Sequence, residues 1–599
     1  MKIPQLPPLL VKKSPSAYYV YVYKNQWDSQ KKRSFRAEQK KVGTILGKEK
    51  EGKVRWSPEF IEQYPELEVF SCERKDRKWI FTPCTQEGLT LKQALQVQKV
   101  HAGATWALDQ IVNNSPLGRS LARVFNKNKD YLRILSLAYF LILTENNNVN
   151  RYDTFSEHTR LPWLHPLSAS AISRLFSRIR PHQIEEFFRL LQSQWKKQKV
   201  LEGNSALVLA LDSTSISSYS EQLVHVARGK NKDKDELPQV NLLMLVDAHS
   251  GLPVFYREYD GNVPDVSTIR RVISDNARLD LREILLVSDK GYSSNKNIED
   301  CLRNDVDFLF NMKCGLANSL TQEIIDDCRC ELADLNNRDR FTQVTGVSKE
   351  VQWRYERNPI KGKKALNRDT KSLYYYVYFD EKIAERSANL LKERIDQICR
   401  KIEEKIPLDE NEQRLFEEVF ILNPGNETHY RINNAKVNEK LAYKGYRVLL
   451  SSKDMGAREA WIAYQDRWVV EDTFKTLKSR LGCSRLRAST EASVQGKIFV
   501  QFLATSIMMM VRSRLKKYAE DKSKKDKLQV IYQSDGKVLA ELNNIMQTRF
   551  NGGYYFSEIA GKKKKFFEAL GVPVPDAEPE ELSEQEDTDP DDFKSEVIA

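Results

Sequence analysis

The pattern of hydrophobic and polar residues at the start of the chain indicates β-structure. Apolar and polar positions alternate in residues 16–27 (SAYYVYVYKNQW) and again in residues 41–56 (KVGTILGKEKEGKVRW), where a glycine marks a turn. A period of two is typical of strands whose two faces meet different surroundings. We therefore predict a small basic β-rich unit over residues 1–85.

From about residue 89 the apolar residues recur with the period of an amphipathic helix. The clearest helical segments, separated by polar breaks, are residues 107–125, 130–143 and 182–195. Between them, Ser168 is a suitable N-cap for a short helix that carries Arg174 and Arg178. That helix suits a role in reading DNA, and it suits an ordinary bundle equally well. The sequence thus predicts a helical region over residues 86–202, with DNA binding as one of two open roles.

Strand-like apolar segments dominate the next part of the chain. One ends at Asp212, two more fill residues 240–262 around a turn at Ser250, a fourth ends at Asp289, and VDFLFNMK is a fifth. With a helix predicted over residues 266–279, the order is three strands, a helix, a strand, a helix and a strand. This order is typical of an α/β sheet that begins with a hairpin.

Residues 314–444 interrupt this pattern with a lysine-rich turn, the strand SLYYYVYF and a long charged helical stretch, so we interpret them as an insertion domain. The segments that resume the α/β pattern are the strand YRVLLSS and two helices over residues 457–481 and 494–518. The predicted fold class is therefore α/β, with one domain divided between residues 203–313 and residues 445–520. A basic helical region is predicted to follow over residues 521–575.

The net charge of the chain is +12, and it is unevenly distributed. Residues 576–599 contain eleven acidic residues and one lysine, so the rest of the chain carries a net charge of +22. We expect this acidic tail to be disordered. A body this basic favours a polyanionic partner, although solvated surface lysines explain the charge equally well.

The composition also bears on location. No run of 18 or more apolar residues occurs, and the longest candidate, residues 498–511, contains Gln501, so we expect a buried helix and no membrane partner. The N-terminus lacks the apolar stretch and cleavage site of a secretory signal, and the eight scattered cysteines form no CxxC pair. We expect a cytoplasmic protein without disulfides.

The helix predicted over residues 457–481 carries a polar stripe. Its members, spaced by three and four residues, are Tyr464, Arg467, Glu471, Lys475 and Lys478. At about 100° per residue they fall within an arc of roughly 80°. A solvated face with ion pairs explains this arc. A carboxylate that holds a metal ion beside phosphate-binding cations explains it as well.

The stripe resembles a signature of DDE transposases, in the large bacterial insertion-sequence group that has a β-strand insertion domain. The signature Y-x2-R-x3-E-x6-K is matched in full at Tyr464, Arg467, Glu471 and Lys478. Trp468 follows the arginine, as it does in well-known members of that group.

Two further motifs resemble those of the same group. The segment DST at Asp212 is similar to its first-aspartate motif, D-x-T, and DKGY at Asp289 is similar to its second, D-R-G-[YF], with Lys290 in place of arginine. The segment GNVPD, which ends at Asp265, resembles the G-N-x-x-D found between them. The two aspartates are 77 residues apart and the glutamate follows 182 residues later, which leaves room for the inserted domain.

This resemblance implies an RNase H-like domain in which Asp212, Asp289 and Glu471 hold two Mg²⁺ ions, for which Mn²⁺ can substitute. Two such ions activate the attacking oxygen and stabilise the leaving oxygen of a phosphodiester, and oxygen ligands suit both metals. The implied activity is DNA cleavage and strand transfer by a cut-and-paste route. The implied partners are double-stranded DNA, at the element's ends and at the target, and a second copy of the chain in a synaptic homodimer.

By the same resemblance, Tyr464, Arg467, Lys475 and Lys478 bind DNA phosphates, and Trp468 stacks against a base or hairpin. A buried core role for Trp468 is equally open. Two other functions are alternatives: a catalytically inactive or domesticated DNA-binding descendant, and an RNase H-like nuclease that does not join strands.

Overall fold

The computed structural model describes residues 6–14, 18–28, 31–46, 50–83, 97–201, 203, 207–220, 222–233, 235–274, 283–314, 319–357, 368–423, 426–488, 490–521, 534–550 and 553–576. The chain divides into two compact units, residues 1–98 with 549–552 and residues 99–548 with 553–599, and each is described by itself. The lysine-rich turn predicted inside the insertion and the acidic tail from residue 577 onward lie outside the described residues.

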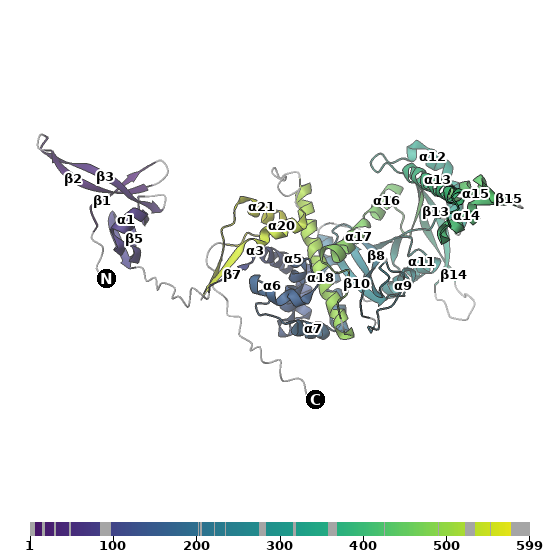
Figure 1. The fold of residues 1–599 in the computed structure, drawn as a ribbon, viewed down its shortest axis with the longest axis horizontal. Coiled ribbons are helices and arrows are strands. Elements are labelled where there is room, and N and C mark those ends of the chain that lie inside the picture. Colours follow the sequence, from purple (N-terminus) through teal and green to yellow (C-terminus); the bar gives the residue numbers. More distant parts are fainter. Residues whose placement is uncertain are drawn as a thin grey trace, which may run out of the picture. The chain divides into compact units, whose positions relative to one another are not determined.

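The first unit is a six-stranded antiparallel meander (Figure 1). Its strands, in sheet order, are β1 (Leu9–Lys13), β2 (Tyr18–Asp28), β3 (Arg33–Leu46), β4 (Gly52–Trp56), β5 (Phe70–Lys75) and β6 (Lys78–Pro83). Helix α1 (Pro58–Gln63) and the short helix η1 (Pro65–Val69) connect β4 to β5. Alternating residues of the meander, such as Val20 and Val42, form a small core with Trp56 and Phe60. The β-strands predicted for this part of the chain are present.

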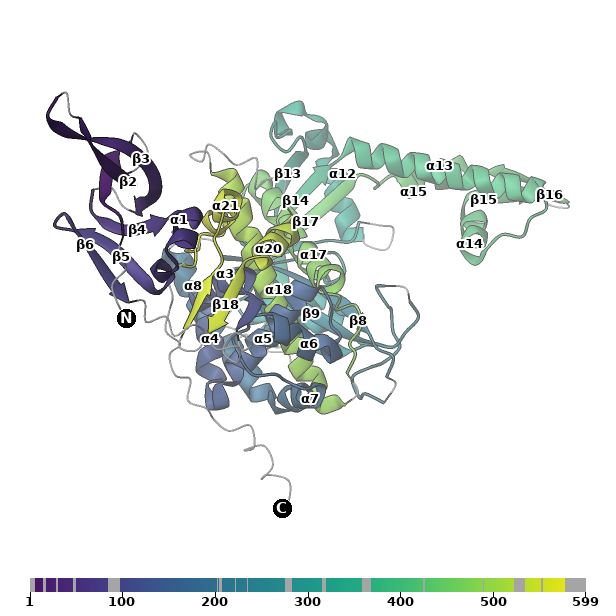
Figure 2. The same cartoon turned by 60° about the vertical axis from the view of Figure 1, so that its left-hand side comes forward.

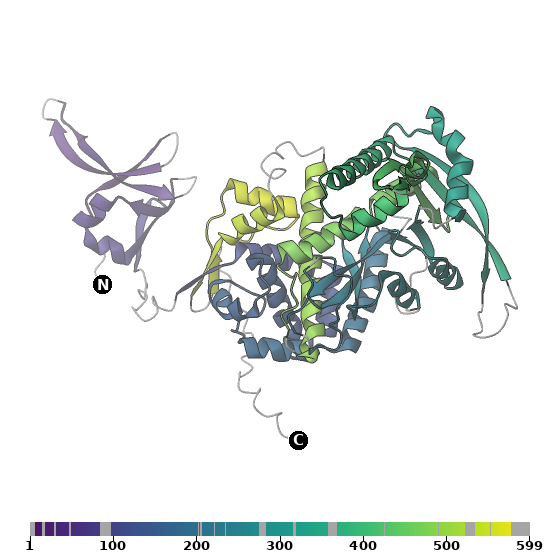
Figure 3. The same cartoon turned by 45° about the vertical axis from the view of Figure 1, so that its right-hand side comes forward.

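The second unit contains a helical part built around one long helix, α18 (Glu491–Glu520). The surrounding helices are α3 (Gly103–Asn113), α4 (Pro116–Val124), α5 (Asp130–Thr144), α6 (Tyr152–His158), α7 (Ala169–Arg178) and α8 (Pro181–Leu201), with short helices η2 (Lys127–Lys129) and η3 (Val149–Arg151). α18 contacts α3, α5 and α7 on one side and strand β10 of the large sheet on the other (Figures 1 and 3).

Among the described helices, α18 alone is long and apolar enough to cross a bilayer, yet 89% of its most apolar stretch is buried inside the protein. That burial is typical of a core helix, as predicted for residues 498–511.

The large sheet has eight strands in the order β10-β9-β8-β11-β12-β17-β14-β13. The strands that form its first five positions are β8 (Leu207–Ser217), β9 (Gln239–Asp247), β10 (Pro253–Asp260), β11 (Ile284–Ser288) and β12 (Asp307–Asn311), with helices α9 (Asp265–Ser274) and α11 (Asn295–Arg303) between them. β8, β11 and β12 run parallel, and the other neighbouring pairs are antiparallel. Every residue of β9 is buried, because protein covers both faces of the sheet there. The predicted order of strands and helices, and the mixed α/β class, are confirmed.

The predicted insertion does not stand apart from this sheet. Its strands β13 (Thr345–Glu356) and β14 (Arg368–Phe379) extend the sheet beyond β17 (Tyr446–Ser451), because β14 pairs with β17 along six positions. The rest of the insertion is helical: α12 (Ser319–Ala333), η4 (Leu335–Asn337), α13 (Glu381–Glu403), α14 (Glu410–Val419) and α15 (Asn434–Leu441), with a hairpin of β15 (Phe420–Asn423) and β16 (Asn426–Ile432). Figure 2 shows α13 extending away from the sheet with α14 and α15 beside it.

The C-terminal part of the second unit packs onto the helical part. Helix α20 (Asp535–Asn543) contacts α3, and α21 (Gly561–Leu570) contacts both α3 and α18. Strands β18 (Met546–Phe550) and β19 (Gly553–Phe556) form a small sheet with β7 (Gln98–His101).

Candidate active site

The register of neighbouring strands brings Asp212 and Asp289 together. β8 and β11 run parallel and their last paired positions are Leu211 and Ser288, so the two aspartates are the next residues on adjacent strands. Adjacent strands lie about 4.8 Å apart. The expectation that the first strand ends at Asp212 is wrong, because β8 stays paired with β9 as far as Ser217. Asp212 is nevertheless at the point where β8 outruns β11.

Asn311 adds a third strand to this row. β12 pairs with β11 up to Phe310 opposite Ser288, so Asn311 comes next to Asp289. The Asn311 amide donates to Asp289 Oδ1 at 3.0 Å and to the Tyr464 hydroxyl at 2.8 Å. That hydroxyl in turn donates to the same Oδ1 at 3.1 Å. Sequence reasoning missed Asn311, although a polar residue at the end of the apolar run VDFLF is a signal that could have found it.

The two aspartates have different electrostatic surroundings. Burial raises the pKa of Asp212 above its usual range, although the Lys232 ammonium opposes this shift. Burial also acts on Asp289, but donors including the Lys290 backbone amide and the Asn311 side chain outweigh it and lower the pKa of Asp289. Asp289 is thus held as a carboxylate, and Asp212 needs a nearby cation to stay charged at low cost.

The helix predicted over residues 457–481 is broken in the structure. Its parts are α16 (Ala457–Gln465), α17 (Trp468–Lys475) and a π-helical turn, η5 (Thr476–Arg480). At the first break the backbone N–H groups of Arg467, Val469 and Val470 bond to carbonyls three residues back rather than four. A tighter turn of this kind changes the rotation per residue, so the helix that carries the polar stripe is interrupted at Arg467 and again after Lys475.

Arg467 is buried at this break and links the carboxylates. Its guanidinium donates to Glu471 Oε1 at 3.0 Å and lies 3.9 Å from Asp212 Oδ2. It also stacks over the ring of Tyr464, 5.4 Å from the centroid. Burial opposes the charged form of Arg467, but Tyr464 and the three carboxylates outweigh it and raise the pKa of the guanidinium. One buried cation therefore compensates an acidic group assembled from two strands and a helix.

The Glu471 carboxylate forms its ion pair with Arg467. Within the described ranges, no three Asp, Glu, His or Cys side chains are gathered closely enough to hold one ion. The donor set still fits a hard divalent cation, because Asp212 and Asp289 offer carboxylate oxygens from neighbouring positions on adjacent strands. The Glu471 side chain is 40% exposed, and Arg467, which it pairs with, also lies 3.9 Å from Asp212.

The residues predicted to bind DNA fall into three groups in the structure. Tyr464 and Arg467 are buried and face the carboxylates. Trp468 is 65% exposed, so the alternative of a core tryptophan is wrong, and Lys475 is exposed as well. The Lys478 ammonium donates to Asp233 Oδ1 at 2.6 Å and is mostly covered.

Lys232 joins the site from the connection between β8 and β9, and sequence reasoning did not find it. Its ammonium donates to the backbone oxygen and the hydroxyl of Ser213, at 2.6 and 2.8 Å. It lies 3.3 Å from Asp265 Oδ2 and 3.8 Å from Asp212 Oδ1. Asp265 itself accepts a hydrogen bond from the Ser213 hydroxyl, so the motif aspartate at the start of α9 belongs to this site.

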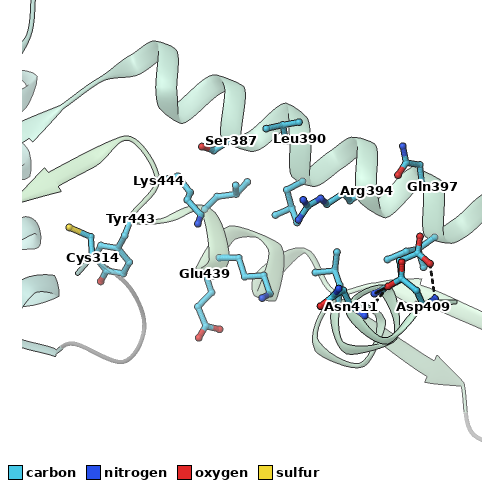
Figure 4. A pocket seen from close by; sticks show the side chains of 16 residues that line it. Cys314, Ser387, Leu390, Arg394, Gln397, Asp409, Asn411, Glu439, Tyr443 and Lys444 are labelled. Carbon is cyan, nitrogen blue, oxygen red and sulfur yellow. Dashed lines mark hydrogen bonds between the residues drawn. The ribbon is translucent and has the colours of Figure 1, made fainter. Parts of the chain in front are cut away.

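A large cavity of the second unit lies elsewhere. It measures about 920 Å³ and lies between α13, α14 and α15 in the inserted helices, lined by residues such as Arg394, Asp409 and Lys444 (Figure 4). None of the residues predicted for catalysis or DNA binding lines it.

Three comparisons place the chain among known proteins. No curated protein matches it. A solved structure described as the cryo-EM structure of the piggyBac transposase synaptic complex with hairpin DNA is similar at 11% identity and a TM-score of 0.32, over 74% of this chain and 79% of that one. The family model described as the transposase DDE domain matches residues 203–507, just over half of the chain. The matched stretch contains Asp212, Asp289 and Glu471, and the chain belongs to the transposase DDE domain family.

Proposed function

We propose that this protein is a DNA transposase of the insertion-sequence group with the Y-x2-R-x3-E-x6-K signature. It binds the ends of its element, cleaves phosphodiester bonds in a metal-dependent reaction and transfers the strands to a target by a cut-and-paste route. The site would use Asp212, Asp289 and Glu471 with two Mg²⁺ ions, or Mn²⁺ in their place. We further propose a cytoplasmic protein that forms a homodimer on paired DNA ends.

The observation that carries this proposal is the register of β8 and β11. It sets Asp212 and Asp289 side by side where the pairing of two parallel strands ends, and Arg467 contacts both Asp212 and Glu471. Carboxylates on adjacent strands and a third on a partly exposed side chain are the arrangement that a two-metal phosphodiester reaction needs.

The chain's own residues prepare the site for this chemistry. Asn311 and Tyr464 both donate to Oδ1 of Asp289 and so fix the orientation of this carboxylate. Arg467 neutralises the carboxylates from the buried side. When bound, divalent ions would activate the attacking oxygen and stabilise the leaving one. Exposed Trp468 and Lys475, on the helix of Glu471, supply stacking and a charge for the DNA strand next to the site.

The experiment that tests this function uses a duplex carrying the ends of the flanking inverted repeats, an added target duplex and Mg²⁺ or Mn²⁺. We expect cleavage at the ends followed by joined products that contain both duplexes. Cleavage without joining would favour the nuclease alternative. End binding without cleavage in either metal would favour the inactive descendant.

Replacing Asn311 by alanine tests the hydrogen-bonded row directly. The change removes donors from Asp289 and from Tyr464, which orient a proposed metal ligand. Losing such an orienting group costs about 10- to 100-fold in metal affinity or activity. We expect single-turnover cleavage to fall by that factor while DNA affinity, measured by filter binding, stays the same. A cleavage rate within twofold of the unaltered protein would remove Asn311 from the site.

A further inference from the structure

Two adjacent residues of opposite charge, Lys232 and Asp233, contact two different parts of the site. One part is the carboxylates of Asp212 and Asp265, and the other is the ammonium of Lys478. Both residues of the dipeptide lie in the connection between β8 and β9. Lys232 reaches the carboxylates of Asp212 and Asp265, and Asp233 reaches the ammonium of Lys478. The Lys232 ammonium therefore lies among oxygen atoms of the kind that bind metal ions. The Asp233 carboxylate lies on an ammonium of the kind that binds phosphate.

The Lys232 ammonium contacts several oxygen atoms. The backbone and side-chain oxygens of Ser213 accept its hydrogen bonds, and carboxylate oxygens of Asp265 and Asp212 lie 3.3 and 3.8 Å away. A hard divalent cation prefers the same kind of ligand. Because Asp212 is a proposed metal ligand, Lys232 and a bound ion would compete for its charge.

The Asp233 carboxylate makes a short contact with Lys478, at 2.6 Å, and the Lys478 side chain is only 14% exposed. The family resemblance implies that Lys478 binds a DNA phosphate, which needs the same ammonium hydrogen atoms. Asp233 therefore takes the position of a phosphate oxygen in the free protein. Burial lowers the pKa of Lys478, and Asp233 opposes that shift, so an anion at this place favours the charged lysine.

Asp235 explains why the dipeptide stays in place. Its carboxylate accepts hydrogen bonds from the Ser217 hydroxyl and the Asn231 amide, and it forms an ion pair with the Arg485 guanidinium at 2.8 Å. These contacts attach the turn to the end of β8. Asp233, by contrast, forms an ion pair with Lys478, which a competing phosphate can replace while the contacts of Asp235 stay in place.

We propose that the Lys232–Asp233 dipeptide is an internal stand-in for metal and DNA phosphate that the substrates displace. The proposal rests on the proposed function of the site. In the free protein Lys232 compensates the negative charge of Asp212 and Asp265, and Asp233 compensates the positive charge of Lys478. On binding, a DNA phosphate replaces Asp233 at Lys478, and a divalent ion replaces Lys232 at Asp212.

The first test compares Asp233→Asn with Glu236→Gln in the full chain. Both changes remove one negative charge from the same turn, but the exposed Glu236 makes no ion pair with any residue that the structure describes. We expect Asp233→Asn to bind a random duplex roughly threefold more tightly at low salt, with no metal present, and Glu236→Gln to change affinity much less. Equal effects of the two variants would mean that general charge is responsible, and the proposal would be overturned.

The second test measures Mn²⁺ binding without DNA, by electron paramagnetic resonance, for Lys232→Met and the matched control Lys230→Met. We expect Lys232→Met to bind Mn²⁺ several-fold more tightly and the exposed Lys230 variant to behave like the unaltered protein. Unchanged or weaker Mn²⁺ binding by Lys232→Met contradicts displacement by metal. If the unaltered protein binds no duplex at all, the proposed function fails and this inference fails with it.

Discussion

Asp212→Asn, Asp289→Asn and Glu471→Gln are each expected to lower the rate of DNA cleavage by about a thousandfold or more. A metal ion at a phosphodiester contributes several kcal/mol of transition-state stabilisation, and each ~1.4 kcal/mol changes a rate tenfold. An amide presents a weaker, uncharged oxygen where the proposed ligand has a full negative charge. The measurement is single-turnover cleavage of an end-bearing duplex in Mg²⁺.

DNA affinity provides the control for these three variants. Most of the affinity of a DNA-binding protein comes from phosphate contacts, which these substitutions leave in place, so we expect dissociation constants within a fewfold of the unaltered value. Asp466→Asn is a matched control variant. Asp466 is an exposed carboxylate beside Arg467, and its substitution changes the net charge by the same amount as each of the three substitutions. If one of the three variants cleaves at the rate of this control, that residue does not hold the metal.

Arg467→Met is expected to destabilise the metal-free protein by about 2 kcal/mol. Removing one partner of a fully buried ion pair costs 3–5 kcal/mol. The expected cost is lower here because the partner carboxylates of Asp212 and Glu471 are 20% and 40% exposed. Urea unfolding in the presence of a chelator measures this change. Added Mg²⁺ should recover part of the loss, because an ion that binds the folded state stabilises it by mass action.

Arg458→Met is the matched control for this prediction. It makes the same substitution on the preceding helix, where the guanidinium pairs with Asp339 but is 57% exposed. Exposed pairs contribute about 0–1 kcal/mol, so the control should unfold nearly like the unaltered protein. Equal destabilisation of both variants, or no gain from Mg²⁺ in Arg467→Met, would contradict the role of Arg467 as the cation that compensates the carboxylates.

The sequence predicted the centre of the sheet because its strands are buried on both faces and appear as apolar runs. Parallel strands with polar residues at their ends also predicted that Asp212 and Asp289 belong to one site. Strand periodicity does not report edges, however. It therefore could not show that β13 and β14 of the insertion continue the same sheet beyond β17.

The helix of Glu471 was harder to predict in detail. An ideal 100° per residue placed Tyr464 and Arg467 on one face with Lys475, but it could not show the break at Arg467 or the π-helical turn after Lys475. Periodicity also does not report which part of a face is covered: Tyr464 and Arg467 are buried, whereas Lys475 is exposed. Lys232 could not be predicted at all. Its partners lie in β8 and α9, and the residues around Lys232 in the β8–β9 connection give no sign of which elements this connection contacts.

The segment that contains α13, α14 and α15 begins and ends at a single point of the sheet, between β14 and β17. Phe379 of β14 pairs with Tyr446 of β17, and the next residues inward, Asp380 and Gly445, are joined by a backbone hydrogen bond of 2.9 Å. Gly445 adopts a left-handed φ of +86°, and a side chain there would collide with Asp380 and Ala384. The segment of α13, α14 and α15 is thus a long insertion in what is otherwise a hairpin connection between β14 and β17. Evolution can lengthen, shorten or exchange such an insertion at small entropic cost, since loop closure depends only weakly on length, while the distant carboxylates keep their strand register.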